Sequence, residues 1–281
     1  MPDRLALVTD STAYLPQEAI DRHRIVVVPL SVAVGDEVLA EGVEISPKDV
    51  AEALRAKRRV TTSRPSPETF AAAYRAAAEE GASGVVSVHI SGELSGTYEA
   101  ARLAATEAGI PVRVVDSRVV GMALGHTVLA AAQALEAGQG LDETVAAATA
   151  RAATTSSFFY VDTLEYLRRG GRIGAARALL GSALAVKPLL HLSGGRIEPL
   201  EKVRTASRAI ARLEELAVEQ AGTAEVDIAV HHLAAEERAE PLAERLRERI
   251  PGLRNLYVCE VGAVIGAHVG PGLLAVVISP R

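Results

Sequence analysis

Small hydroxyl residues and glycines follow one of the most hydrophobic segments of this sequence. GVVSVHI, residues 84–90, is followed by SGELSGT, residues 91–97, and an alanine-rich stretch with helical spacing comes next. Glycines let a ligand approach the backbone, and a helix N-terminus favours a negatively charged group. The segment therefore predicts a site for a carboxylate or a phosphate. Alternatively, Ser95 only caps the helix that starts at Gly96, by accepting a backbone N–H of the first turn.

A second group of hydroxyls lies in TTSRPSPETF, residues 61–70. Ser66 followed by Pro67 is typical of a helix start, so we expect Ser66 to be a structural cap. Thr62 and Ser63 lie before this cap, in what we expect to be a loop, and are free to present their hydroxyls outward. Two such segments in one domain strengthen the prediction of a polar binding site.

Asp10 and Ser11 follow the short hydrophobic run LALV at 5–8. An aspartate at this place can be a catalytic carboxylate or a metal ligand. More often an Asp-Ser pair organises the turn between a strand and a helix, and we favour that interpretation. The pair Asp116 and Ser117 repeats the arrangement after a later strand, and the same interpretation applies to it.

Two further candidates are a histidine and an arginine in the second half of the chain. His268 lies in the glycine-rich stretch GAVIGAHVGPGLLAVVI, residues 262–278. It can reach a ligand as a neutral donor or as an imidazolium, or it can simply be a loop histidine bonded to the backbone. Arg204 closes an expected strand just before a helix, where solvation at the surface is the default role of an arginine.

Several kinds of catalytic and metal site are disfavoured by the sequence. A hydrolase elbow needs glycine two residues on either side of Ser95, but Glu93 and Thr97 stand there. A nucleotide phosphate loop needs a Gly-Lys-Ser/Thr run, which does not follow. Cys259 is the single cysteine, so no disulfide within the chain and no CxxC metal site can form. We expect no metal site and no cofactor.

Composition indicates a large aliphatic core. Of the 281 residues, 49% are hydrophobic but only 3% are aromatic, and the length suggests two domains. A net charge of −5 without a dense basic tract does not favour nucleic acid or an anionic membrane as partner. The most apolar long segment, 119–137, contains Gly121, Gly125, His126 and Gln133, which does not suit a membrane span. The N-terminus does not resemble a signal peptide, so we expect a cytoplasmic protein.

The first half alternates short hydrophobic runs with stretches of helical spacing, which predicts a parallel sheet covered by helices. The expected strands are 5–8, 26–34 in two pieces, 84–90 and 112–117, and the expected helices are 67–80, 96–108, 119–137 and 142–155. Most of these strands end in small polar residues, at the edge where open α/β sheets bind ligands. The fold class is therefore α/β.

The aromatic cluster at 158–160 marks the start of a second α/β domain, which we expect to contain a mixed sheet. The expected domains are therefore 1–157 and 158–281. A hairpin is predicted where 186–192 and 196–203 flank two glycines. The other expected elements are helices at 206–220 and 234–249 and strands at 225–231, 253–259 and 273–279.

Eight motifs occur in the order and spacing of one known family. They are VTDSTAYLP, TTSRPSP, SGELSGTY, VVDS, LEYLRRGGRI, KPLL, KVRT and AHVGPG. The chain thereby resembles the DegV family of bacterial fatty-acid-binding proteins, which includes the FakB-type subunits of fatty acid kinase. The resemblance implies two α/β domains with a fatty acid held in a tunnel between and within them.

Residue roles follow from the same resemblance. Thr62, Ser95, His268 of the GPG motif and Arg204 of the KVRT motif match the positions that bind the fatty acid carboxylate at the domain interface. Supporting loop roles fall on Gly96, Ser63, Asp10 and Ser11. Arg64 and Glu93 depart from the usual family residues, which are Gln and a hydrophobic residue such as Leu, and both lie beside the head-group loops.

The resemblance implies a carrier without chemistry of its own. It would bind a long-chain fatty acid such as palmitate and present it to a separate fatty acid kinase, with the arginines of 168–172 helping to dock that partner. No nucleic acid and no stable membrane insertion are expected. The alternative is an enzyme, similar to a kinase or a hydrolase, that acts on a small phosphorylated or carboxylated metabolite with Asp10, Ser95 and His268.

Overall fold

The computed structural model describes residues 4–179 and 187–281, and its contacts divide the chain into two units. The first unit runs up to Ser31 and continues with Ser63–Thr154, and the second contains Val32–Thr62 and Thr155–Arg281. The sequence analysis expected a single division between residues 157 and 158, which would place Val32–Thr62 in the first unit, whereas the contacts place this segment in the second. The physical reason is packing, because helix α2 in that segment lies against α10 near the C-terminus.

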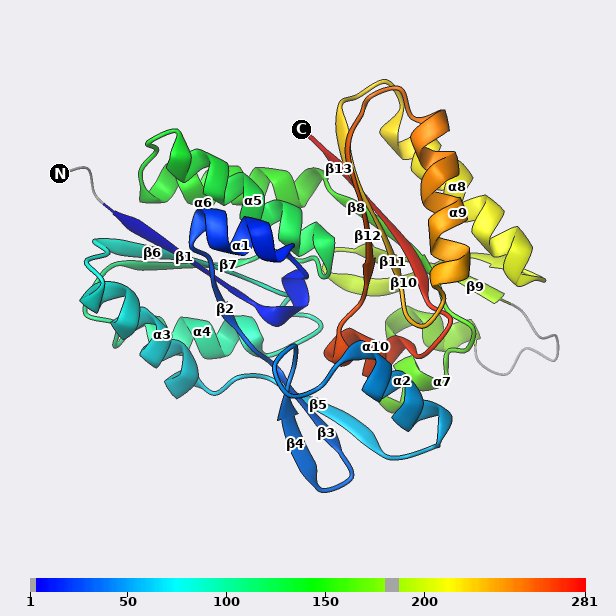
Figure 1. Cartoon of the computed structure of the whole chain (residues 1–281), viewed down its shortest axis with the longest axis horizontal. Helices are drawn as coiled ribbons and strands as arrows, with labels where there is room; N and C mark the ends of the chain where they lie inside the picture. The colour runs from blue at the N-terminus through cyan, green and yellow to red at the C-terminus, as the bar shows by residue number, and fades with distance from the viewer. Residues whose placement is uncertain (1–3, 180–186) are drawn as a thin grey trace. The chain divides into compact units, whose positions relative to one another are not determined.

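The first unit is built on a parallel sheet with the strand order β2-β1-β6-β7 (Figure 1). Its strands are β1 (Leu5–Asp10), β2 (Val26–Val28), β6 (Gly84–His89) and β7 (Val112–Asp116), and its helices are α1 (Gln17–His23), α3 (Pro67–Glu79), α4 (Thr97–Ala105), α5 (Met122–Glu136) and α6 (Leu141–Thr154), with a 3-10 turn η1 at Ser11–Ala13. Helices α3 and α4 cover one face and α5 and α6 the other. Every residue of β6 is buried, as expected for a parallel strand covered on both faces.

The second unit is built on a six-stranded mixed sheet with the order β10-β9-β8-β13-β11-β12. Its strands are β8 (Ser156–Tyr160), β9 (Lys187–Ser193), β10 (Arg196–Val203), β11 (Val226–His232), β12 (Leu253–Glu260) and β13 (Leu274–Pro280). Only β11 and β12 pair in parallel. Helices α8 (Ala206–Ala221) and α9 (Glu236–Arg249) pack on one face through an aliphatic core that includes Leu213, Ile228 and Leu242 (Figure 1).

The elements predicted from periodicity are confirmed. The chain forms the two expected α/β units, one with a parallel sheet and one with a mixed sheet. Strands β9 and β10 make the predicted antiparallel hairpin around Gly194 and Gly195. Val186, the expected first residue of that hairpin, lies outside the described residues. Ser66 caps α3 as predicted, since its hydroxyl accepts the Thr69 N–H at 3.2 Å.

Several short elements of the second unit were not predicted. A three-stranded sheet has the order β4-β3-β5, and its strands are β3 (Ser31–Val34), β4 (Glu37–Ala40) and β5 (Val60–Ser63). The short helices are α2 (Pro47–Arg55), α7 (Glu165–Arg169) and α10 (Ala263–Val269), with a 3-10 turn η2 at Gly174–Leu179. Two expected loops are therefore wrong: Thr62 lies in β5 and His268 in α10. Within α10, Gly266 packs closely on Leu233, where a Cβ would lie only 3.2 Å from the leucine side chain, so this glycine serves the packing of a helix and not a loop.

Within the part of the chain that the structure describes, no helix combines the length and the apolarity that a membrane crossing requires.

Candidate functional site

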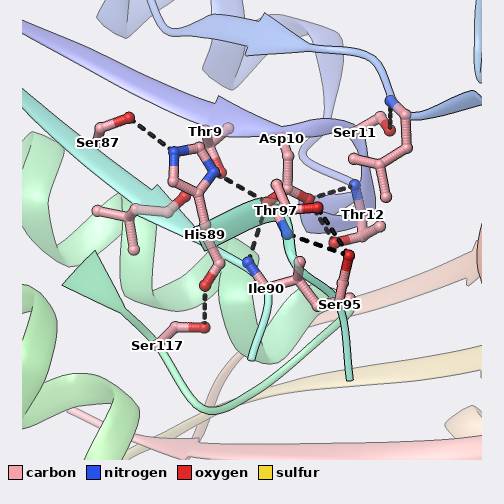
Figure 2. Close-up of polar contacts among 12 residues, drawn as sticks. Thr9, Asp10, Ser11, Thr12, Ser87, His89, Ile90, Ser95, Thr97 and Ser117 are labelled. Atoms are coloured by element: carbon pink, nitrogen blue, oxygen red, sulfur yellow. Dashed lines mark hydrogen bonds and ion pairs between the residues drawn. The ribbon is translucent and has the colours of Figure 1, made fainter. Parts of the chain in front are cut away.

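Asp10 ties together the ends of two neighbouring strands in the first unit (Figure 2). It ends β1 and is fully buried. One carboxylate oxygen accepts the N–H of Thr12 at 3.1 Å and its hydroxyl at 2.5 Å. The other accepts the N–H of Ile90 at 2.9 Å and lies 3.0 Å from Nδ1 of His89. These contacts favour the interpretation of Asp10 as a turn organiser, and its burial removes it from the reach of a substrate.

A hydrogen-bonded chain continues from Asp10 into the core. Nε2 of His89 lies 2.7 Å from the Ser87 hydroxyl, which in turn accepts the Tyr74 hydroxyl at 2.9 Å. Ser87, His89 and Asp10 are the residue types of a hydrolase triad, but all three are fully buried. A nucleophile must reach its substrate, so this arrangement is structural. Burial raises the pKa of Tyr74 to about 12, which keeps its hydroxyl protonated as the donor.

The loop after β6 is held by the next strand. Asp116 at the end of β7 accepts the backbone N–H groups of Gly92 and Arg118, each at 3.0 Å. The buried Ser117 donates its hydroxyl to the carbonyl of His89 at 2.6 Å. The pair Asp116–Ser117 therefore organises a turn at the end of β7, as Asp10–Ser11 does at the end of β1. Ser11 accepts the N–H of Leu30 at 3.0 Å.

Ser95 does not cap a helix from the position expected. Helix α4 begins at Thr97 and its N-cap residue is Gly96. The Ser95 hydroxyl nevertheless accepts the Thr97 N–H at 3.3 Å and lies 2.8 Å from the Thr97 hydroxyl. Figure 2 shows both residues beside the turn formed by Asp10 and Thr12. The polar ends of β1 and β6 thus come together as the sequence predicted.

Arg64 lies across the same loop. Its Nη1 donates to the Gly96 carbonyl at 3.4 Å, and a Cβ on Gly96 would lie only 2.2 Å from that nitrogen. The neighbouring Ser63 is exposed. The departure from the family pattern at position 64 therefore places a guanidinium over the loop that carries Ser95.

A cavity of about 570 Å³ lies in the second unit and contains the other two leading candidates. Thr62 of β5 and His268 of α10 both line it, and the Thr62 hydroxyl lies 2.8 Å from Nε2 of His268. Two residues separated by 206 positions in the sequence are thus joined by a hydrogen bond. Arg204 is exposed and is not among the residues that line this cavity.

The cavity is strongly basic. Five cationic residues line it, and none of the described residues that line it is acidic; the five are Lys57, Arg58, Arg59, Arg169 and Arg172. Arg169 also pairs with Glu165 at 2.7 Å, and Arg172 donates to the Gly170 carbonyl at 2.7 Å. A basic cavity with a hydroxyl and an imidazole suits an anionic group. The sequence analysis missed the run 57–59, although three adjacent basic residues were visible before β5.

His268 is neutral at pH 7. Burial, and to a smaller extent the positive charge of Arg172, lowers its pKa to about 4. A neutral imidazole has one N–H donor and one acceptor nitrogen. Whether His268 donates to Thr62 or accepts from it therefore depends on which ring nitrogen carries the proton.

His231 and His232 are adjacent at the end of β11. In the described ranges, no group of three or more His, Cys, Asp or Glu side chains could hold a metal ion. His231 is buried and lies 3.5 Å from the sulfur of Cys259. Burial lowers the pKa of His231 to about 4 and raises that of Cys259 to about 12. Both groups are thus neutral at pH 7, and the thiol is a poor nucleophile.

Comparison with known proteins gives a consistent result. The family model described as "Uncharacterised protein, DegV family" matches residues 4–281. A DegV domain-containing protein of Streptomyces coelicolor is 66% identical over 281 residues, which is the full length of both chains. A DegV family protein from Thermus thermophilus, described for its fatty acid binding, is 37% identical, with a TM-score of 0.93 over 99% of this chain and 100% of that one. DegV of Bacillus subtilis, described as a fatty acid binding protein, is 34% identical with a TM-score of 0.92 over the same shares.

Proposed function

This chain belongs to the DegV family, and we propose that it binds a long-chain fatty acid such as palmitate and holds the carboxylate at Thr62. The observation that carries the proposal is the basic cavity in which the Thr62 hydroxyl is bonded to a neutral histidine. Structures 37% and 34% identical to this chain, which match it over nearly its whole length, are those of fatty-acid-binding proteins.

Magnitudes suggest a division of labour between the two ends of the ligand. Burying about 15 methylenes at about 0.8 kcal/mol each contributes on the order of 12 kcal/mol before association costs are subtracted. Each hydrogen bond to a charged head group contributes only about 1.5–3 kcal/mol. The acyl chain then sets most of the affinity, while the polar residues orient the ligand and select a carboxylate over an uncharged head group.

Ser95 and Arg204 remain predicted ligands of the carboxylate. Ser95 is half-buried and Arg204 is exposed. Substitution of each by alanine tests the two residues separately. If a residue binds the carboxylate, its substitution should weaken fatty acid binding without changing the stability of the protein. An unchanged dissociation constant for the Arg204→Ala variant would remove that residue from the site.

We propose further that the protein is a carrier that performs no reaction itself and presents its fatty acid to a separate kinase. The exposed Arg168, which pairs with Glu165 on α7, offers a basic docking point. In an Arg168→Ala variant, the partner kinase should phosphorylate the bound fatty acid more slowly, while the affinity of the protein for the fatty acid stays unchanged. Arg75→Ala is the matched control, because Arg75 is also exposed and paired, with Glu68 on α3. Equal effects of the two variants would contradict docking through α7.

The test of fatty acid binding is native mass spectrometry of freshly purified protein, followed by denaturation and identification of the released lipid. We expect a mass increment equal to one free long-chain fatty acid, which is lost in a Thr62→Ala/Ser95→Ala variant. A protein that purifies empty and stays empty after incubation with palmitate and with oleate would overturn the proposal. In that case the enzyme acting on a small metabolite becomes the better hypothesis.

A further inference from the structure

Helices α7 and α10 of the second unit pack against each other through two aromatic rings, each of which lies against a glycine at the end of the other helix. A Cβ on Gly170, which ends α7, would lie 2.0 Å from Nδ1 of His268. A Cβ on Gly270, which ends α10, would lie 2.1 Å from the ring of Tyr166. Each helix thus places an aromatic ring against the glycine that ends the other.

Gly170 is required for space and not for its backbone conformation. Its φ of −73° is one that any residue adopts. The ring of His268 excludes a side chain there, because the three nearest atoms to the missing Cβ are Nδ1, Cε1 and Cγ of that ring, at 2.0, 2.7 and 3.2 Å. The imidazole therefore packs edge-on against the Gly170 backbone.

The two nitrogens of His268 have different surroundings. Nε2 lies 2.8 Å from the Thr62 hydroxyl. Nδ1 is buried and has no hydrogen-bond partner among the residues that the structure describes. A proton on Nδ1 would therefore bury a donor without an acceptor, whereas a proton on Nε2 is shared with Thr62.

We propose that packing against Gly170 fixes His268 in the tautomer protonated at Nε2, so that His268 donates to Thr62 and the Thr62 hydroxyl is free to donate to the ligand. Thr62 thereby becomes a directed donor, and His268 is a positioning residue that acts through it. The low pKa of His268 agrees with this assignment, because it keeps the ring neutral. The identity of the ligand rests on the proposed function, but the tautomer does not.

The direction of this hydrogen bond matters because an ionised carboxylate only accepts hydrogen bonds. In the opposite tautomer, the Thr62 hydroxyl would donate to Nε2 and would turn only lone pairs toward the cavity. A carboxylate would be repelled by them. The tautomer therefore makes the difference between a hydroxyl that binds a fatty acid anion and one that rejects it.

The tautomer can be measured directly by NMR on the full chain labelled with 15N at its seven histidines. The signals of His268 are assigned by their loss in a His268→Gln variant. We expect Nδ1 to resonate as an unprotonated ring nitrogen and Nε2 as a protonated one at pH 7. The reverse pattern, or one averaged between the two tautomers, would overturn the proposal.

The role of Gly170 is tested with a pair of neighbouring glycines. Gly170→Ala should displace the His268 ring, change its 15N signals and weaken fatty acid binding at least about tenfold, which corresponds to the loss of one head-group hydrogen bond. Gly171→Ala is the control, because φ at Gly171 is +72° and no described residue comes within 4 Å of its missing Cβ. That variant strains the same turn without touching His268, so its ring signals and affinity should stay close to wild type.

The outcomes separate this inference from the proposed function. A wild-type protein that binds no fatty acid but shows the Nε2–H tautomer contradicts the function and leaves the tautomer established. A protein that binds fatty acid with His268 protonated at Nδ1 contradicts the inference alone. Equal affinities of the Gly170→Ala and wild-type proteins would also overturn it. If Gly170→Ala fails to fold, the wild-type NMR measurement still decides the tautomer.

Discussion

His89 in the first unit and His268 in the second each hydrogen-bond a hydroxyl group, but the two histidines differ in what surrounds their second nitrogen. His89 is fully buried, and both of its nitrogens are engaged, by Ser87 and by Asp10. His268 lines a cavity, and its second nitrogen rests on a glycine. The first arrangement is closed, and the second opens onto space for a ligand.

The difference shows which polar clusters are structural and which are available for binding. The cluster around His89 satisfies the donors and acceptors at two strand ends and fixes those ends. The pair of Thr62 and His268 lies in a basic cavity and retains hydrogen-bonding capacity that a ligand can use. Substitutions in the first cluster should therefore lower stability, whereas substitutions in the second should lower binding.

The largest effect is expected from Asp10→Ala. Removing this carboxylate leaves His89, the N–H of Ile90 and the N–H of Thr12 buried without their acceptor. The free energy of unfolding should fall by about 3–5 kcal/mol, as measured by urea denaturation. Asp116→Ala is the matched control, because Asp116 is only partly buried, and it should lose about 1 kcal/mol. A loss below about 1 kcal/mol for Asp10→Ala would mean that the cluster does not stabilise the fold.

Thr62→Val should affect fatty acid binding and not stability, the opposite of what is expected for Asp10→Ala. Valine keeps the size of the side chain and removes only the hydroxyl, so fatty acid binding should weaken by about 1–3 kcal/mol while stability changes little. Isothermal titration with palmitate measures the binding change. Thr61→Val is the control, since Thr61 lies next in β5 and lines the same cavity but is not bonded to His268. If both variants bind equally well, Thr62 is not the donor to the carboxylate.

Acid should weaken the second unit through its neutral histidines. The pKa of His268 is about 4 in the folded protein and about 6.5 in an unfolded chain, so the unfolded state binds more protons between these values. The stability from keeping this ring neutral is complete above pH 6.5 and is lost as pH falls toward 4. At pH 5 the loss attributable to His268 should be about 1–2 kcal/mol.

A pair of variants isolates this contribution. His268→Gln should lose less stability between pH 7 and pH 5 than the wild type does, as followed by urea denaturation at each pH. His231→Gln should behave in the same way, because burial also lowers the pKa of His231 to about 4. Identical pH dependence in His268→Gln and wild type would show that His268 titrates normally and that its surroundings do not hold it neutral.

The comparison also shows what the sequence could and could not predict. Periodicity predicted the strand that carries Asp10 and the strand before the Ser95 loop, because both are hydrophobic runs that end in small polar residues. It missed α2, although Ser46, Pro47 and Asp49 form a helix-start signal in the sequence. It also missed α10, which has only seven residues and contains a glycine that packs on Leu233. Residue type made Thr62 and His268 separate candidates, but their pairing spans 206 positions, so residue spacing could not predict it, and only the family resemblance assigned both to one site.

Residues whose roles arise solely from folding could not be predicted at all. His89 appeared only as part of a hydrophobic strand, yet it joins Asp10 across 79 positions. Gly170 ends α7, and the ring of His268 occupies the place that its side chain would take. Distances of this kind depend on how α7 meets α10, which no local pattern encodes.

The smallest effect is expected at Gly96, which sharpens the comparison with Gly170. A Cβ on either glycine would lie close to a nitrogen, at 2.2 Å from Nη1 of Arg64 and at 2.0 Å from Nδ1 of His268. Arg64 is exposed and flexible, so its guanidinium can swing away. Gly96→Ala should therefore cost about 1 kcal/mol or less in urea denaturation. Since the ring of His268 is held by Thr62 and by packing, it cannot move in the same way, and Gly170→Ala should be the more damaging change for fatty acid binding. Equal losses of affinity in the two variants would show that the distance between the new Cβ and the neighbouring group sets the loss, and that the rigidity of that group does not.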